Sequence, residues 1–149
     1  MDPDTTSELP KIQIAAGLVV GGGGKLLLMR KRGTQPFIQP GGRVQPGERP
    51  IDALRREMKD ELGVIISASS PMPLGHFSAP AANDPSYVTE ADVFKLALIQ
   101  SPTPAGEIEE VIWVAPEQAS LLNLCALTRD HLLPLFRGMS SGKLAPILS

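Results

Sequence analysis

The sequence is short of cysteine, histidine and aromatic residues. Cys125 is the only cysteine among 149 residues, which excludes an internal disulfide framework and a zinc site built on paired cysteines. A lone thiol is typical of a reducing compartment. His76 and His131 are the only histidines, so a His-rich metal centre is not expected. A bound metal would therefore need oxygen ligands, which favours Mg²⁺, Mn²⁺ or Ca²⁺.

A charge excess and a long apolar run are absent as well. The chain has 14 basic and 16 acidic residues, for a formal net charge of −2, so the footprint of a general nucleic-acid binder is missing. Its longest apolar stretch, residues 14–20, is too short to cross a bilayer. Residues 1–10 contain no apolar run of the kind that secretory signals have. We expect a cytoplasmic protein without a membrane or nucleic-acid polymer as partner.

The remaining composition, 42% hydrophobic and 20% charged, is typical of one folded domain. We expect a flexible leader over residues 1–10 and a single domain over 11–149. The irregular order of strands and helices predicts an α/β sandwich with a mixed sheet. Strands 12–20 and 25–32 are expected to pair as a hairpin across a four-glycine turn. Further strands are predicted over 64–66, 74–79, 87–99 and 110–114, and helices over 50–62, 116–122 and 128–136, the last distorted by Pro134.

Three carboxylates lie on one face of the predicted helix 50–62. Glu57, Asp60 and Glu61 are spaced i, i+3 and i+4, next to the apolar stripe of the same helix. Their mutual repulsion and their place in the last turn, where negative charge opposes the helix dipole, both cost stability. Two interpretations are open: a divalent cation that compensates the charge, or a solvated acidic face with local partners such as Arg56 with Asp60.

The loop before this helix favours the first interpretation. Gly41 and Gly42 allow the backbone to approach a ligand closely, with carbonyl groups that can face a cation. Glu48 lies just before the helix, and Arg56 lies two turns along it. We expect Arg56 to reach back to Glu48 and to clamp the loop onto the helix.

This segment resembles the Nudix box, whose pattern is G-x5-E-x7-R-E-U-x-E-E-x-G-U, with U a bulky aliphatic residue. The resemblance implies a Nudix hydrolase with an α/β/α sandwich fold. Such an enzyme uses Mg²⁺ or Mn²⁺ to cleave the diphosphate linkage of a nucleoside diphosphate derivative, such as a nucleoside triphosphate or ADP-ribose. The pattern falls on Gly42, Glu48, Arg56, Glu57, Met58, Asp60, Glu61, Gly63 and Val64.

The resemblance also implies roles for individual residues. Glu61 and Asp60 are the implied metal ligands, and Glu57 is a ligand or the base that orients the attacking water. The Gly41 carbonyl is a further candidate ligand, with Glu48 and Arg56 as the supporting pair of the catalytic site. The chain departs from the family at two positions: Asp60 replaces a glutamate, and Gln39 stands where relatives often have an apolar residue.

The family often uses a further acid beyond the box, shortly before a strand that carries Trp. Glu107, Glu109 and Glu110 precede Trp113 here. Glu107 is the favoured metal ligand because it follows Gly106 in a predicted loop, with solvated surface acids as the alternative.

Three residues are candidates for binding the substrate. Arg30 and Arg32 alternate onto one face at the end of the second strand and could meet a phosphate; a solvated strand end is the alternative. Phe37 could stack on a base, or pack in the core. The alternative to an enzyme is a catalytically silent Nudix-fold module that binds nucleotides or regulates a partner. Dimers are common in related proteins, so a homodimer is a candidate assembly.

Overall fold

The computed structural model of the chain describes residues 9–82, 84 and 86–140. Residues 1–8 of the predicted leader and residues 141–149 of the predicted domain lie outside this part. Within it, four strands form a mixed sheet in the order β3-β1-β5-β4, in which only β1 and β5 run parallel. Two further strands, β2 and β6, pair antiparallel beside it. The strands are β1 (Lys11–Val19), β2 (Leu26–Lys31), β3 (Gly41–Arg43), β4 (Met72–Pro80), β5 (Val88–Leu96) and β6 (Ile108–Val114).

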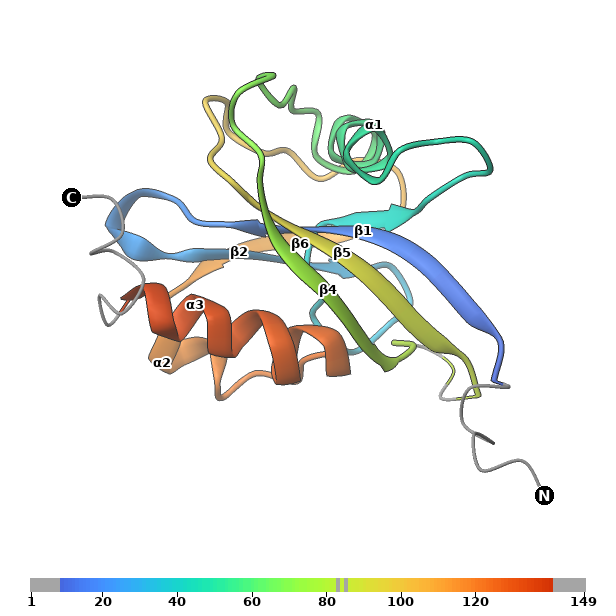
Figure 1. The fold of residues 1–149 in the computed structure, drawn as a ribbon. Helices are drawn as coiled ribbons and strands as arrows, with labels where there is room; N and C mark the ends of the chain where they lie inside the picture. The colour runs from blue at the N-terminus through green and yellow to red at the C-terminus, as the bar shows by residue number, and fades with distance from the viewer. Residues whose placement is uncertain (1–8, 83, 85, 141–149) are drawn as a thin grey trace.

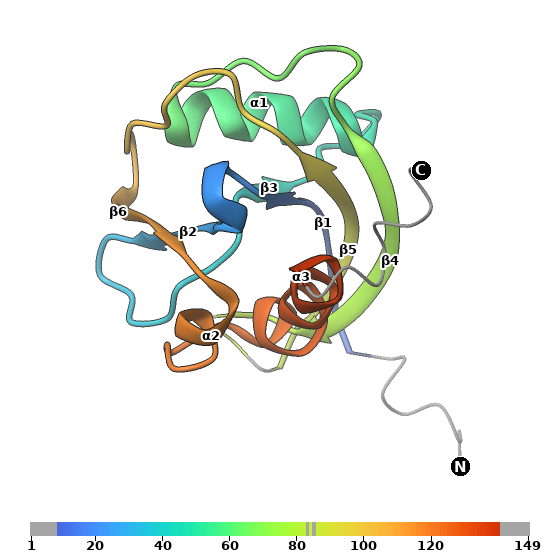
Figure 2. The same cartoon turned by 90° about the vertical axis from the view of Figure 1, so that its left-hand side faces the viewer.

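Helices cover both faces of the strands, as Figures 1 and 2 show. One face carries α1, and the opposite face carries α2, η3 and α3. The predicted α/β/α sandwich with a mixed sheet is therefore confirmed. In the described part of the chain, no helix has the length and hydropathy that crossing a bilayer requires. The helices are α1 (Pro50–Leu62), α2 (Pro116–Ala119), the π-helical η3 (Thr128–Leu132) and α3 (Leu133–Ser140).

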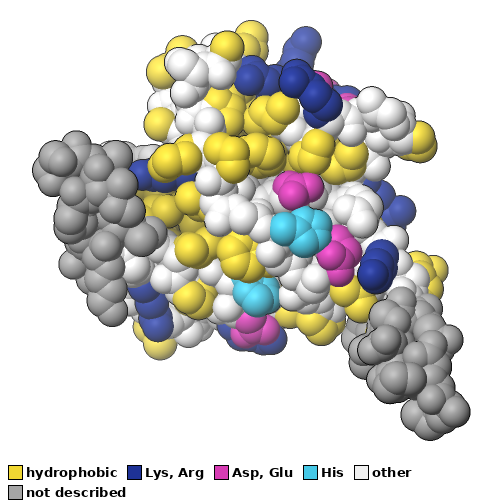
Figure 3. All heavy atoms as spheres, viewed as in Figure 1, with side chains coloured by type: hydrophobic (Ala, Val, Ile, Leu, Met, Phe, Trp, Pro, Cys, Tyr) yellow, Lys and Arg dark blue, Asp and Glu magenta, His cyan; other side chains and the backbone are white. Residues whose placement is uncertain are grey.

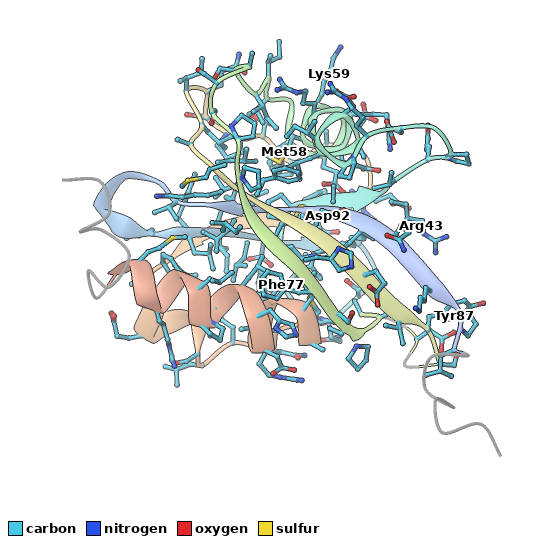
Figure 4. All side chains as sticks on the ribbon, viewed as in Figure 1. Arg43, Met58, Lys59, Phe77, Tyr87 and Asp92 are labelled. Atoms are coloured by element: carbon cyan, nitrogen blue, oxygen red, sulfur yellow. The ribbon has the colours of Figure 1, made fainter. Side chains whose placement is uncertain are left out.

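The core has two parts because successive side chains of β1 point to opposite faces. Ala15 and Val19 pack with the apolar stripe of α1. Ala16 and Leu18 pack on the other side, with residues of α3 and the segment before it. Figure 4 shows Met58 on the side of α1 that faces the sheet. A central strand that is buried on both faces thus fixes α1 against the sheet.

Helix α1 has the bounds that its sequence predicts. Pro50 occupies the first turn, and Gly63 ends the helix in the left-handed conformation at φ 68°, its N–H bonded to the Lys59 carbonyl. The predicted strand 64–66 was wrong. Its main-chain groups bond to side chains instead: Arg55 Nη1 donates to the Ile66 carbonyl at 2.9 Å, and the Ile65 N–H donates to Gln100 at 2.8 Å.

The predicted hairpin was also wrong, although a glycine turn (η2, Gly22–Gly24) does connect its strands. Between β1 and β2 only the bridge of Val20 with Leu26 forms. Both edges of β1 are occupied by β3 and β5, so β2 pairs with β6. The last helix is distorted as expected: it is π-helical from Thr128 to Leu132, directly before the segment that contains Pro134.

Candidate active site

A pocket of about 440 Å³ lies where the last turns of α1 face β3 and the loop before β6. Its lining divides into two sides of different chemistry. The acidic side consists of Glu57, Asp60, Glu61 and Glu107. The apolar side consists of Ile12, Ile14, Pro80, Ala81, Ala82 and Leu127. The fold therefore brings the three carboxylates of α1 and the favoured loop acid Glu107 together in one cavity.

Glu61 is a buried carboxyl group without a cationic partner. It is 8% exposed, and among the described residues its carboxyl group accepts a single hydrogen bond, from the Gly41 N–H at 3.3 Å. No basic residue in the described ranges forms an ion pair with it. Burial, and next the neighbouring charge of Glu57, raise the pKa of Glu61 to about 8. The site therefore disfavours the charged form of Glu61, which a bound cation would stabilise.

Arg56 joins the loop before α1 to the acidic side of the pocket. Its Nε and Nη2 atoms each donate to Glu48 at 3.0 Å, so the predicted clamp is present. Its Nη1 donates to Glu57 at 3.0 Å, and Nη2 also bonds the Arg43 carbonyl at 2.9 Å. These hydrogen bonds lower the pKa of Glu48 to about 2. Arg56 thus fixes the orientation of the Glu57 carboxylate.

Two glycines allow β3 to approach the carboxylates. A Cβ on Gly42 would lie 2.5 Å from the carboxyl carbon of Glu57, so a side chain there would displace that group. Gly41 has φ +130°, a conformation that side chains rarely adopt. A side chain at Gly41 would also collide with the Ala15 carbonyl of β1. The backbone next to Glu57 and Glu61 therefore depends on both glycines.

The three acids before Trp113 lie in different surroundings. Glu107 lines the pocket, and the loop that carries it is tied to α1, because the Ala105 N–H donates to the Glu61 carbonyl at 2.9 Å. Glu109 and Glu110 instead form ion pairs with arginines at 3.3 and 3.1 Å. Of the three candidates, Glu107 is the one in the pocket.

The predicted substrate residues lie outside this pocket. Arg30 pairs with Glu110 and Arg32 with Glu109, so both guanidinium groups are engaged. Phe37 packs against the core on the α3 side. Their roles in substrate binding stay predictions.

Four pocket residues were not singled out as site residues from the sequence. Lys31 and Arg43 bring positive charge to the lining, and Gln39 and Thr89 bring polar groups to its apolar side. Arg43 follows the glycines of the box, and Gln39 was already noted as a departure from the family. Lys31 lies between Arg30 and Arg32, so in a strand its side chain points to the opposite face from theirs, and it lines the pocket.

The donor set fits a hard divalent cation. Within the described ranges, no three Asp, Glu, His or Cys side chains are already grouped as a metal site. The pocket does combine several carboxylates with a buried Glu61 that forms no ion pair with a described residue, although the more distant charge of Lys31 acts to lower its pKa. Carboxylate oxygens are the ligands that Mg²⁺ prefers, so a cation would relieve the electrostatic cost at Glu61.

The fold and site define a Nudix protein: a NUDIX domain model matches residues 11–136, and the chain belongs to the Nudix hydrolase family. As a member it is a pyrophosphohydrolase. It is 30% identical over 114 residues to the nucleoside triphosphatase NudI of Salmonella heidelberg (strain SL476), covering 70% of this chain and 81% of that protein. It is 40% identical over 58 residues to the 8-oxo-dGTP diphosphatase of Haemophilus influenzae, covering 36% of this chain and 43% of that protein.

Solved structures agree on the fold. The MutT protein from Methanosarcina mazei Go1 superposes with a TM-score of 0.73 at 23% identity, covering 89% of this chain and 97% of that one. A UDP-X diphosphatase gives a TM-score of 0.73 at 20% identity, covering 96% of this chain and 73% of that one.

Proposed function

We propose that this chain hydrolyses the diphosphate linkage of a nucleoside triphosphate, with Mg²⁺ or Mn²⁺ as cofactor. The observation that carries the proposal is the pocket itself: a buried, unpaired Glu61 among further carboxylates lies in the same cavity as an apolar surface. An acidic site needs a cation before it can accept a triphosphate, and an apolar surface suits a base. The relatives named for nucleoside triphosphates and 8-oxo-dGTP support this substrate class.

The metal would be held by Glu57, Asp60, Glu61 and Glu107, with the Gly41 carbonyl as a further ligand. When bound, it neutralises phosphate charge and lowers the pKa of a coordinated water. Asp60 reaches less far than the glutamate of the family pattern, so the position of the metal relative to this residue is specific to this chain.

Glu57 is the group that we assign to orienting the attacking water. Its carboxylate is held by Arg56 Nη1 at 3.0 Å, and Arg56 is itself held by both oxygens of Glu48. A carboxylate fixed in this way keeps one orientation towards a water in the pocket. Glu48 and Arg56 therefore act through Glu57 and not on the substrate.

Lys31 and Arg43 are the cations that we assign to the phosphate chain. Both line the pocket, and neither side chain forms an ion pair with a residue of the described ranges. Free cations beside a carboxylate cluster suit the anionic substrate that the cluster alone would repel. Cytoplasmic location and a homodimer stay predictions.

A hydrolysis panel tests the proposal. The protein is incubated with Mg²⁺ or Mn²⁺ and with dNTPs, 8-oxo-dGTP, ADP-ribose, NADH and dinucleoside polyphosphates, with Glu61→Gln as control. We expect turnover of a triphosphate that the variant loses. Turnover of ADP-ribose alone would show that the substrate is a nucleotide sugar and not a nucleoside triphosphate. Binding of a nucleotide without product release would favour the silent module.

A further inference from the structure

Gln39 is a buried polar residue on the apolar side of the pocket. It is 8% exposed and lies in the segment between β2, which pairs with β6, and β3, which belongs to the four-stranded sheet. The main chain is fixed on both sides of it: Ile38 exchanges two hydrogen bonds with Met29 at 2.7 and 2.9 Å, and the Pro40 carbonyl accepts from the Gly17 N–H at 2.9 Å. The position of its side chain is therefore set by the fold.

The amide oxygen of Gln39 is occupied. Thr128 Oγ1 donates to Oε1 at 2.5 Å and Cys125 Sγ donates to it at 3.4 Å, with the hydroxyl and the thiol 3.3 Å apart. Thr128 is fully buried. A hydroxyl can donate or accept, whereas a thiol is a weak donor and its sulfur a weak acceptor. In the structure both groups face the amide oxygen, so Thr128 and Cys125 donate to it and the amide nitrogen is left for another partner.

The amide nitrogen of Gln39 has no protein partner in the described part of the chain. Among the described residues no fully enclosed side-chain nitrogen or oxygen lacks a partner. Nε2 is therefore not fully enclosed, and Gln39 lines the pocket, so we take Nε2 to face this cavity. The result is a fixed N–H donor on a largely apolar side of the pocket, whose lining includes Ile12, Ile14 and Leu127. A ligand that buries this surface leaves the donor unsatisfied unless it brings an acceptor.

We propose that Gln39 is a specificity residue whose Nε2 donates a hydrogen bond to a carbonyl oxygen of the nucleobase, an inference that rests on the proposed function. Keto bases (guanine, uracil and thymine) offer such an oxygen where adenine and cytosine carry an amino group. An amino group facing Nε2 leaves two donors opposed and unpaired, which a buried site rejects. Thr128 is the positioning residue, because its hydroxyl keeps the amide from rotating.

The test compares triphosphates that differ only in keto against amino character: dUTP with dCTP, and dGTP with the triphosphate of 2,6-diaminopurine deoxyriboside. We expect kcat/KM to favour the keto member of each hydrolysed pair by about tenfold or more. Gln39→Met, of similar size, should bring the ratio close to one. A ratio near one in the wild type, or an unchanged ratio in Gln39→Met, overturns the proposal.

Two further variants keep the proposal falsifiable if Gln39→Met unfolds. Gln39→Glu replaces the donor by an acceptor and should shift preference towards the amino bases, which donate to carboxylates. Thr128→Val should relax discrimination, whereas Thr128→Ser, which keeps the hydroxyl, should preserve it. Equal discrimination in Thr128→Val and Thr128→Ser contradicts the positioning role.

A metal-free readout separates this inference from the proposed function. Calorimetric binding of dUMP against dCMP, and of dGMP against its 2,6-diaminopurine analogue, should follow the same keto preference without added metal. If no triphosphate is hydrolysed but the monophosphates show this preference, the proposed function fails and the role of Gln39 stands. If triphosphates are hydrolysed without keto preference, the proposed function stands and the role of Gln39 fails.

Discussion

Two carboxylate clusters of this protein differ in how their charge is balanced. The α1 cluster, Glu57 and Glu61, lies in the pocket. The β4–β5 cluster, Glu90 and Asp92 with His76 between them, lies on a solvent-exposed part of these two strands. Figure 3 shows acidic and histidine side chains side by side on the surface. His76 bonds Glu90 at 2.7 Å and Asp92 at 3.1 Å.

The pKa shifts of the two clusters run in opposite directions. Hydrogen bonds, first from Ser78 and then from His76, lower the pKa of Glu90. Burial and a like charge raise the pKa of Glu61 to about 8. Glu90 of the β4–β5 cluster thus has hydrogen-bond donors within the protein, whereas Glu61 forms no ion pair with a described residue. The two clusters therefore differ in the surroundings of one acid each, a buried Glu61 and a Glu90 that accepts hydrogen bonds from Ser78 and His76.

The largest expected effect compares one acid from each cluster. Glu61→Gln should lower kcat by several orders of magnitude and leave the protein folded, because glutamine has the size of glutamate and is uncharged, as the protonated Glu61 of the metal-free protein is. Glu90→Gln, the same chemical change outside the pocket, should leave kcat within about twofold. Steady-state hydrolysis and thermal melting of both variants measure this. Near-normal turnover of Glu61→Gln would remove Glu61 from the metal site.

Arg56→Ala tests the support of the α1 cluster. The change removes the hydrogen bonds to Glu48, Glu57 and the Arg43 carbonyl, so we expect a lower melting temperature and a loss of roughly 10–100-fold in kcat. Arg49→Ala is the matched control, because Arg49 pairs with Asp52 on the exposed side of the same helix. Unchanged melting of Arg56→Ala would contradict the clamp.

The pH dependence of stability should differ in sign between the clusters. The metal-free folded protein keeps a proton on Glu61 up to a pH of about 8, against 4.5 for the ordinary group. Glu61 should therefore make stability fall as the pH rises from about 4.5 to 8. Glu90 has a lowered pKa, so its contribution is lost as the pH falls below its ordinary range. Urea unfolding across this range measures both.

Matched variants assign the two slopes. Glu61→Gln should abolish the decline between pH 4.5 and 8, and added Mg²⁺ should offset it in the wild type by stabilising the carboxylate form. Glu90→Gln should leave that decline intact. A decline that Glu61→Gln retains would show that another group causes it.

The smallest effect concerns His76. Its hydrogen bonds to Glu90, and next to Asp92, raise its pKa above 6.5. The stabilisation that this gives is complete below 6.5 and is lost as the pH rises through the raised value. His76→Gln should lower the melting temperature slightly at pH 6, lower it less at pH 9, and leave kcat unchanged. A loss of activity would connect the β4–β5 cluster to the pocket.

Helix α1 could be predicted from the sequence because its signals are local. Pro50 and Gly63 mark its ends, and its apolar spacing fixes the buried face. The pairing of β1 could not be predicted in the same way. A glycine turn brings two strands close, but which edge each strand fills is decided by β3, β5 and β6, which lie far along the chain.

The candidate site divides along the same line. The spacing of Glu57, Asp60 and Glu61 and the clamp of Arg56 on Glu48 depend on helix geometry and one short loop, so they follow from the sequence. Arg30 was interpreted as a phosphate ligand because Glu110, its partner, lies 80 residues away. Gln39 was noted without a function for the same reason, since Cys125 and Thr128 reach it only in the folded chain.

Direct binding of Mn²⁺ tests the central claim, that the α1 cluster, in which Glu61 forms no ion pair with a described residue, takes the cation and that the β4–β5 cluster does not. Electron paramagnetic resonance of free Mn²⁺ can be used to titrate the wild type, Glu61→Gln and Glu90→Gln. We predict saturable binding to the wild type that Glu61→Gln weakens strongly and Glu90→Gln leaves unchanged. Equal binding by the wild type and Glu61→Gln, or loss of binding in Glu90→Gln, would contradict the account.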